Sequence, residues 1–193
     1  MNENLVHVPG LDGLKVMLGA VTAARYAEVG LDRMAAAARA LGDTAAVAVV
    51  DCPASPSLWP SFLPALDLAV IVLRADAASL DALWRVMPVL RGCGAEERAV
   101  LAFNFAGMEG MLPEAECRKA ARTFTTAPVV SFLPEDPGVR RAFAQCECYA
   151  LRNPSSPFCR AVGEILEAVV PYRAETAAKK SFLKPFLGIF SKR

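Results

Sequence analysis

Short apolar runs recur along the chain, separated by longer and more polar stretches that are rich in alanine. The runs are Ala46–Val50, Leu68–Leu73, Ala99–Phe103 and Val129–Leu133, with Leu14–Leu18 as a candidate fifth. Each run is apolar throughout rather than alternating, which is typical of a strand covered on both faces. Strands that alternate with helix-length segments predict an α/β fold, with a mainly parallel sheet of about five strands and helices on both faces.

The stretches between the runs carry helix start and stop signals. Gly42 is expected to end the first helix, Pro88 to end or kink the second, and Pro171 to stop the last. We therefore expect one α/β domain over residues 1–171, a linker over 172–178 and a separate tail over 179–193. The expected helices are Thr22–Leu41, Ser79–Leu90, Glu114–Thr123, Val139–Ala144 and Ser156–Val170.

Composition narrows the class of protein. The chain has 193 residues, is 54% hydrophobic and carries a net charge of +1. Five basic residues and no acidic residue lie in 179–193, so the rest of the chain is acidic and a poor match for nucleic acid. No window holds the ~18 apolar residues of a membrane span, and the start lacks a secretory signal. We therefore expect a cytoplasmic protein.

The usual metal ligands are sparse. His7 is the only histidine, and the six cysteines are scattered, with Cys146 and Cys148 forming a C-x-C pair. Structural zinc sites use paired C-x2-C knuckles or histidines. The sequence therefore predicts no metal site and reduced thiols.

Polar residues follow each expected strand, at the edge where an open parallel sheet binds its ligands. Asp51 and Pro53 follow the first run, Asp76 follows the second, Asn104 follows the third, and Pro134–Pro137 follows the fourth. This edge is the expected functional site.

These residues, in this order, resemble the MinD/ParA branch of P-loop ATPases. The matching motifs are a strand ending in Asp-x-Pro, a strand ending in asparagine, and the segment SFLPEDPGVRRAFAQ; together the resemblance spans about residues 5 to 170. Within the family, the pattern is most similar to the cellulose-biosynthesis branch, BcsQ. The resemblance implies that Asn104 matches the adenine-reading asparagine. It places the nucleotide-site positions at Asp51, Pro53, Asn104, Pro134 and Asp136.

The family's phosphate-binding loop has no counterpart in these 193 residues. Gly10 and Gly13 are not followed by Gly-Lys-Ser/Thr, and Lys15 lies inside an expected strand. Phosphates need consecutive backbone N–H groups and a lysine around them. We therefore expect the site positions to be vestigial, with no bound cofactor and no catalysis. We therefore expect a MinD/ParA-like adaptor or regulator that acts through protein–protein contacts at the cytoplasmic face of the membrane; the resemblance implies a role in cellulose or exopolysaccharide secretion.

Two alternatives remain open. The chain could be one half of a split ATPase, with another chain supplying the phosphate loop. It could also be an unrelated small-molecule-binding α/β domain with a site near Asp51, Asp76 and Asn104. In the family the missing strand is central, so the exposed edge of Ala46–Val50 favours a protein partner or a dimer.

The tail has the pattern of an amphipathic basic helix. On a helical projection its large apolar side chains fall within an arc of about 160°, which is typical of a helix lying in a membrane interface. This predicts peripheral binding to an anionic inner membrane; a helix packed on the domain or docked on a protein is the alternative. The tail residues expected to contact the membrane or a partner are Phe182, Leu183, Lys184, Phe186, Leu187, Ile189, Phe190, Lys192 and Arg193.

Deleting Ser181–Arg193 should abolish binding to anionic vesicles, because both the apolar surface and the basic residues that attract the headgroups are removed. Sedimentation with vesicles containing phosphatidylserine measures this, with neutral vesicles as the control. Equal sedimentation of the full-length and shortened chains would contradict the assignment.

Overall fold

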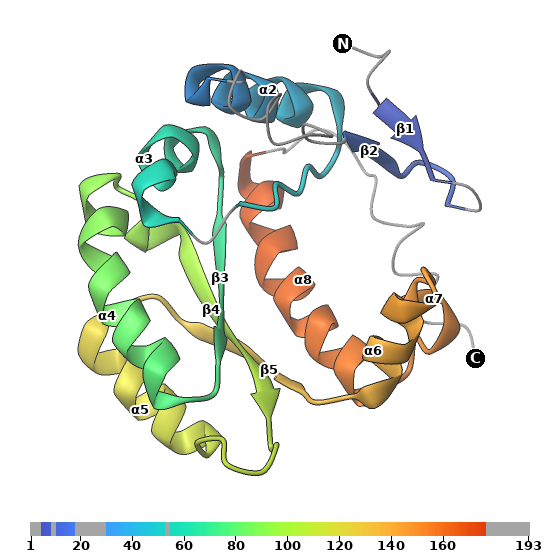
Figure 1. The fold of residues 1–193 in the computed structure, drawn as a ribbon. Coiled ribbons are helices and arrows are strands. Elements are labelled where there is room, and N and C mark those ends of the chain that lie inside the picture. The colour runs from blue at the N-terminus through green and yellow to red at the C-terminus, as the bar shows by residue number, and fades with distance from the viewer. Residues whose placement is uncertain (1–4, 9–10, 18–29, 53–54, 177–193) are drawn as a thin grey trace.

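The computed structural model describes residues 5–8, 11–17, 30–52 and 55–176. Its centre is a parallel sheet in the order β3-β4-β5, made of β3 (Ala69–Arg74), β4 (Ala99–Ala106) and β5 (Val129–Pro134) (Figure 1). These strands coincide with three of the expected apolar runs, and all are parallel as predicted.

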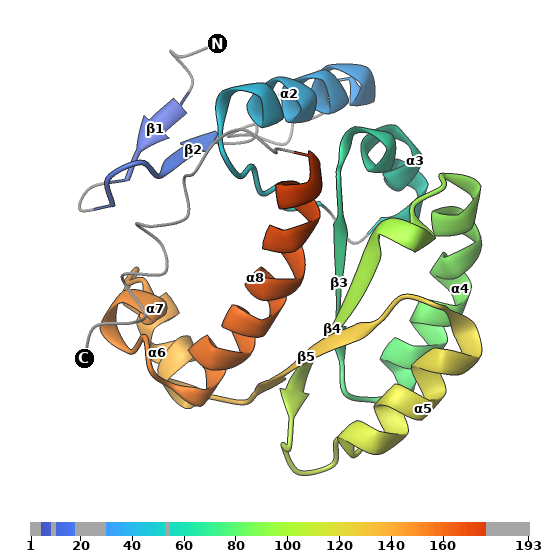
Figure 2. The same cartoon turned by 180° about the vertical axis from the view of Figure 1, so that it is seen from behind.

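Helices cover both faces of this sheet, as the two views of the fold show (Figures 1 and 2). The helices α4 (Ala77–Gly92) and α5 (Glu114–Phe124) pack on one face, and α8 (Pro157–Thr176) lies on the other. The chain adds β4 and then β5 in one direction across the sheet, so crossovers of one hand place α4 and α5 on the same face.

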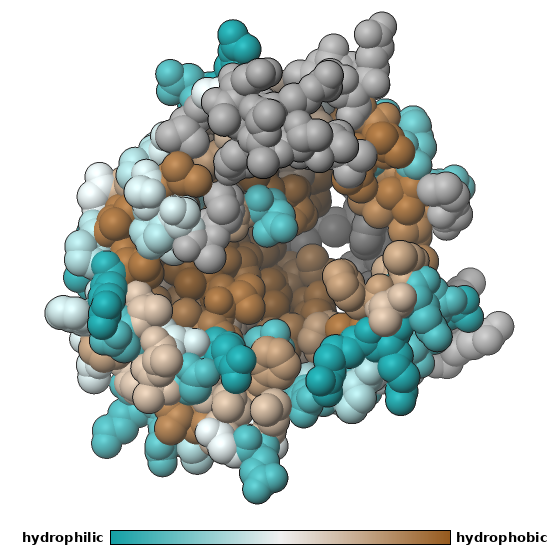
Figure 3. Space-filling view, viewed as in Figure 1, coloured by the Kyte–Doolittle hydropathy of each residue, from teal (hydrophilic) through white to brown (hydrophobic). Residues whose placement is uncertain are grey.

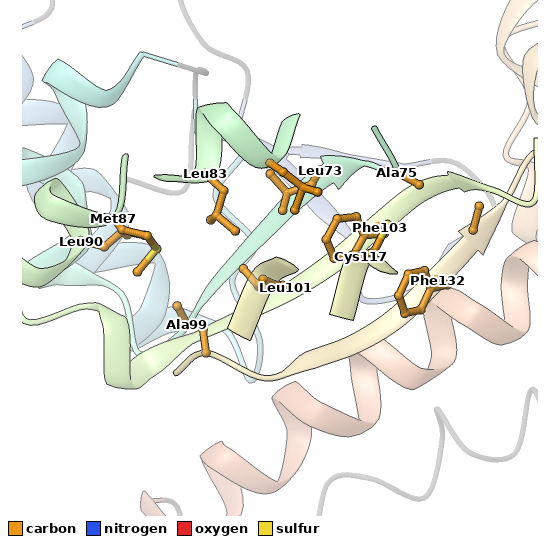
Figure 4. Packing of buried hydrophobic residues seen from close by; sticks show 14 of the residues in the cluster. Leu73, Ala75, Leu83, Met87, Leu90, Ala99, Leu101, Phe103, Cys117 and Phe132 are labelled. Atoms are coloured by element: carbon orange, nitrogen blue, oxygen red, sulfur yellow. The ribbon is translucent and has the colours of Figure 1, made fainter. Parts of the chain in front are cut away.

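The main core lies between the sheet and the α4–α5 layer (Figure 4). Leu101 and Phe103 of β4 are fully buried there, and the Phe103 ring stacks on that of Phe132 with centroids 5.3 Å apart. Leucine and methionine at helical spacing on α4 pack against them. The buried α4 residues are Leu80, Leu83, Met87 and Leu90.

The α8 face has a smaller core. Ala102 of β4 and Leu133 of β5 pack with Ala161 of α8. Ser131 is buried among them, and its hydroxyl donates a hydrogen bond of 2.8 Å to the Ala161 carbonyl, so this polar group is satisfied. The bond fixes where α8 lies across β5.

A polar network ties the core helices to the sheet at the amino ends of the strands. Glu96, in the short 3-10 helix Glu96–Arg98, forms an ion pair of 2.7 Å with Arg91 and accepts a 2.9 Å hydrogen bond from the Thr125 hydroxyl. Arg91 also donates to the Phe124 carbonyl. The bonds from Arg91, and then those from Thr125, hold the pKa of Glu96 below its ordinary value.

Smaller elements surround the sheet. A separate antiparallel pair consists of β1 (Leu5–His7) and β2 (Lys15–Met17). Within the described ranges, no helix is long and apolar enough to cross a bilayer. The remaining elements are α2 (Leu31–Thr44), the 3-10 helices Pro56–Leu58 and Leu63–Ala65, α3 (Trp59–Phe62), α6 (Pro137–Ala144) and α7 (Tyr149–Arg152).

The prediction of an α/β fold with a parallel sheet is confirmed, and in the part of the chain that the structure describes two of the expected strands lie outside the three-stranded parallel sheet. Residues 46–50 form no strand: they leave α2 as a connection toward α3, with Val47 53% and Val49 87% exposed. No strand among the described residues lies between them and β3 to complete a ladder. Leu14–Leu18 does contain a strand, but it pairs with β1 through a turn in which Gly13 has a φ of 88°.

Helix ends also differ from the predictions. The helix α2 continues past Gly42 to Thr44, and α4 continues through Pro88 to Gly92. Proline removes one hydrogen bond within α4, but four buried side chains on that helix outweigh the loss. The backbone of α8 continues through Pro171 to Thr176, so most of the expected linker is helical. The tail lies outside the described residues, and its membrane role remains a prediction.

Replacing Phe103 by alanine should lower the free energy of unfolding by about 3–5 kcal/mol, because it leaves a cavity at the centre of the core. Urea unfolding followed by circular dichroism measures the change. The control is Phe143→Ala on α6, where the ring is exposed and a change within about 0.5 kcal/mol is expected. Equal losses in the two variants would contradict this assignment of the core.

Candidate functional site

The carboxyl end of β4 contains a strained turn. The Asn104 side-chain oxygen accepts a 2.9 Å hydrogen bond from the backbone N–H of Phe105, and Phe105 has a left-handed φ of 59°. A non-glycine residue in this conformation costs roughly 1–3 kcal/mol, and such strain gathers at functional sites. The turn therefore marks this edge of the sheet as the candidate site.

The end of β3 is braced against this turn. The Arg74 guanidinium lies over the Phe105 ring, 5.1 Å from its centroid, and pairs with Asp76 at 2.9 Å. Asp76 also caps α4, because its other carboxylate oxygen accepts a 2.8 Å hydrogen bond from the Ser79 N–H. The bond from Ser79 is the main reason that the pKa of Asp76 is below its ordinary value. Both carboxylate oxygens of Asp76 are thus bonded within the fold.

The loop after β5 uses its acidic residue in the same way. Asp136 caps α6 through a 2.8 Å hydrogen bond from the Gly138 N–H and accepts a second bond from the Tyr149 hydroxyl. Tyr149, followed by Gly138, lowers the pKa of Asp136. A Cβ on Gly138 would lie 2.8 Å from the Tyr149 ring, so glycine is required for this packing. Both oxygens of this predicted site residue are therefore engaged in joining α6 to α7.

Asp51, unlike Asp76 and Asp136, does not cap a helix. It ends the connection from α2, is exposed, and makes no hydrogen bond or ion pair with the described residues. Its charge contributes, after burial, to raising the pKa of the neighbouring Cys52 thiol. Pro53 lies outside the described residues. Of the three aspartates at the expected strand ends, Asp51 is the one whose carboxylate is not used by a cap.

A pocket of about 300 Å³ lies beside the site, at the carboxyl ends of β4 and β5 and against the first turns of α8. Its volume is at the lower end of the range for ligand pockets. The sequence pointed to Pro134 but not to the other residues, because Arg160 and Glu164 are one turn apart on a helix and carry no motif. The lining residues are Ala106, Gly107, Glu114, Phe132, Pro134, Pro157, Arg160, Ala161 and Glu164.

The charges around this pocket limit what it can hold. Glu114 and Glu164 contribute two carboxylates, and Arg160 contributes one guanidinium that already donates to the Ser155 carbonyl. An excess of negative charge repels phosphates. An uncharged polar group, such as a base or a sugar, is compatible with these walls.

The Asn104 side chain has unused hydrogen-bonding capacity; it precedes by two residues Ala106, which lines the pocket, but does not line the pocket itself. Its oxygen is bonded to Phe105, whereas its NH₂ group has no partner among the described residues. A carboxamide has two donors and two acceptor positions, so Asn104 can still donate to a ligand. The edge therefore combines a strained turn, an available amide and a small pocket that disfavours anions.

The fold is similar to the folds of several proteins of known structure. The MinD cell division ATPase of Pyrococcus furiosus has a TM-score of 0.74 at 20% identity, covering 88% of this chain and 70% of that one. The septum site-determining protein MinD of Pyrococcus horikoshii OT3, solved with Mg-ADP, has a TM-score of 0.72 at 20% identity, with coverages of 87% and 68%. A ParA family ATPase of Chlorobium tepidum TLS gives 0.69 at 14% identity, with coverages of 83% and 65%.

One curated relative matches in sequence. It is an uncharacterized ATP-binding protein of Methanocaldococcus jannaschii, 24% identical over 191 residues, which are 95% of this chain and 70% of that protein. No family model matches the chain.

These findings establish a MinD/ParA-like fold and correct one expectation. The absent phosphate loop suggested a protein without catalysis; the ATP-binding relative and the ATPase neighbours instead point to an ATPase. The prediction was wrong because it treated a missing loop as a missing activity. The narrower resemblance to the cellulose-biosynthesis branch stays a prediction.

Replacing Tyr149 by phenylalanine should destabilise the α6–α7 region, because Asp136 loses a hydrogen bond to its charged form. The pKa of Asp136 is lowered in the folded state, so this stabilisation is complete near pH 7 and is lost as the pH falls through that lowered pKa, below about pH 4. Urea midpoints of the two proteins should therefore differ at pH 7 and converge at low pH. A difference that is independent of pH would contradict the role given to this hydrogen bond.

Proposed function

We propose that this chain provides the base-binding side of the adenine-nucleotide site of a MinD/ParA-type ATPase. The phosphate-binding loop would belong to a segment that these 193 residues do not contain. The observation that supports this most directly is the strained Asn104–Phe105 turn with its available amide, which leads directly into Ala106 and Gly107 in the wall of a pocket that disfavours phosphate. The similarity to ATP-binding proteins supplies the choice of ligand.

Asn104 would read the base. A carboxamide can donate to one edge atom of adenine while accepting from its amino group. The oxygen of Asn104 keeps a second lone pair beyond its bond to Phe105, and the backbone of that turn is held in one conformation by the same bond. Pro134 would form part of the wall against the base, whereas Asp136 would act indirectly by fixing the α6–α7 loop.

The phosphates would need groups from elsewhere. Phosphoryl transfer relies on positioning by loop amides, a lysine and a metal ion. Arg74, a cation in contact with the turn, is already paired with Asp76 and stacked on Phe105. A split site, in which each part supplies one half of the nucleotide contacts, reconciles an ATPase fold with the missing loop.

A magnesium ion would be compatible with a nucleotide site whose contacts come from two parts. The ion prefers one or two carboxylates together with phosphate oxygens and waters. Asp51 has the right chemistry, since it is exposed and is not used by a helix cap, while its phosphate and hydroxyl partners would come with the nucleotide and the missing loop. The ion would supply charge neutralisation at the phosphates, and Asp51 would hold it on the side of this chain.

The place of action would be a membrane surface, reached through the basic amphipathic tail. This part of the proposal is supported by the sequence pattern of residues 179–193. A single tail of this kind binds reversibly, and two tails in a complex would bind far better through effective concentration. The order of the motifs supports a role in polysaccharide secretion only by resemblance.

Adenosine should bind to the full chain with a dissociation constant of about 1 mM, and ATP should bind no more than a few times better, because its phosphates have no cradle. Asn104→Ala should weaken adenosine binding about tenfold by removing its hydrogen bonds to the base. Equilibrium dialysis or isothermal titration with both ligands measures this. The control is Asp81→Asn, an exposed residue on α4.

Two results would count against the proposal. If adenosine does not bind at millimolar concentration, the base side is wrongly assigned. If ATP binds a hundredfold better than adenosine to this chain alone, a phosphate site exists within it and the divided site is wrong. Guanosine, whose edge pattern differs from that of adenine, serves as the specificity control.

A further inference from the structure

Two of the six cysteines are exposed to solvent, and they are near neighbours in the chain. Cys146 and Cys148 are separated by a single residue, between the end of α6 and the start of α7. The other four are buried or partly buried: Cys52, Cys93, Cys117 and Cys159. The exposed pair is therefore the most open to reagents, because buried thiols are generally inert.

The fold does not use either of the exposed thiols. Cys146 occupies the left-handed position that follows α6, with a φ of 55°. That position ordinarily favours glycine, because a side chain there is strained. Cys148 precedes α7, and its side chain makes no capping hydrogen bond. Since both side chains are exposed and neither makes a hydrogen bond with the described residues, no structural role accounts for them.

The turn that carries the two thiols is held on both sides. The Cys146 N–H donates to the Phe143 carbonyl at 3.1 Å, and the Glu147 N–H donates to the Ala142 carbonyl at 2.9 Å. Together these two bonds form a Schellman motif, which closes α6. The Glu147 side chain forms an ion pair of 2.6 Å with Arg152 of α7. The two thiols are therefore presented on a defined frame.

The two cysteines are close enough to be joined. Two peptide steps separate their Cα atoms by at most about 7 Å, and disulfides join Cα atoms about 4.4–6.8 Å apart. A bond between cysteines so near in sequence closes a small and strained ring. Strained and exposed disulfides are easily reduced, so a bond formed here would be readily reversed.

The surroundings of the pair admit a water-soluble reagent. The helices α6 and α7 lie at the margin of the fold, away from the α4–α5 layer (Figures 1 and 2). The surface over them in Figure 3 is largely hydrophilic. The charged residue between the two thiols, Glu147, has its charge balanced by Arg152. A reagent can therefore approach the thiols without meeting an unpaired carboxylate between them.

We propose that Cys146 and Cys148 form a redox-active dithiol site that exchanges with low-molecular-weight disulfides, such as glutathione disulfide. The site is separate from the proposed nucleotide site and does not depend on it, since neither cysteine lines the pocket at the ends of β4 and β5. A readily reversed disulfide is suited to sensing the redox state of the surroundings rather than to bracing the fold.

The exchange takes two steps through a mixed disulfide. The thiolate of one cysteine attacks a sulfur atom of glutathione disulfide, whose S–S bond breaks, and one glutathione leaves as a thiolate that takes up a proton. The second cysteine then loses its proton and attacks the protein sulfur of the mixed disulfide, which releases the second glutathione. The two protein thiols are thereby oxidised to one disulfide, and one glutathione disulfide is reduced to two thiols.

Mass spectrometry of the full chain tests the site. Trypsin cleaves after Arg141 and Arg152, so the peptide of residues 142–152 carries both thiols and no other cysteine. After incubation with excess glutathione disulfide and alkylation of free thiols, most of this peptide should have lost two hydrogen atoms and should carry no glutathione. Excess reduced glutathione should then restore both thiols.

Single variants identify the intermediate. Cys146→Ser and Cys148→Ser should each stop at a mixed disulfide with one bound glutathione, because the second thiol is absent. Cys93→Ser, at a partly buried position outside the turn, is the matched control and should close like the parent chain. Three results with the parent chain would each overturn the proposal: no reaction, two glutathiones bound to the peptide, or a disulfide that joins two chains through this peptide.

The same chain unfolded in urea separates the contribution of the fold from that of the sequence. At one ratio of oxidised to reduced glutathione, the proportion of the 142–152 peptide in the disulfide form should be several-fold higher in the folded chain, because the turn holds the two thiols together. An equal or lower proportion in the folded chain would overturn the site as a feature of the fold.

Discussion

The structure depends on the complete burial of β4. Its residues Leu101, Ala102 and Phe103 have no exposed surface, because the strand is paired on both edges and covered on both faces. Apolar burial is the main favourable term in folding, and here it requires β3 and β5 as neighbours, α4 and α5 on one side, and α8 on the other. The strained turn at Asn104 can be maintained because the strand that leads into it cannot move.

Burial on both edges and both faces, which is complete for β4, is only partial for β3. Its inner edge pairs with β4 and its core face is buried, whereas its outer edge meets no strand among the described residues, and Val70 and Val72 on its other face remain 38% and 59% exposed.

The polar residues at the carboxyl edge of the sheet fall into two groups: those that hold the fold together and those that do not. Asp76 and Asp136 cap helices and hold Arg74 and Tyr149, so they build the frame of the site. Asp51 and the NH₂ group of Asn104 are not used in this way. Among the described residues at this edge, these two groups are therefore the ones that the fold does not use for its own caps.

Local pattern in the sequence was sufficient for much of this protein. The continuous apolar runs of β3, β4 and β5, and the helices between them, were predictable because burial on both faces leaves a periodicity that single segments carry. The assignment of Asn104 and the Pro134–Asp136 loop to a nucleotide site stays a prediction. Only the tertiary structure decided which runs became paired strands: Ala46–Val50 has the composition of one but has no neighbour among the described residues. It also decided that Asp76 and Asp136 serve as caps and that Arg160 and Glu164 line a pocket. These outcomes depend on distances between segments far apart in the chain, and no local pattern encodes them.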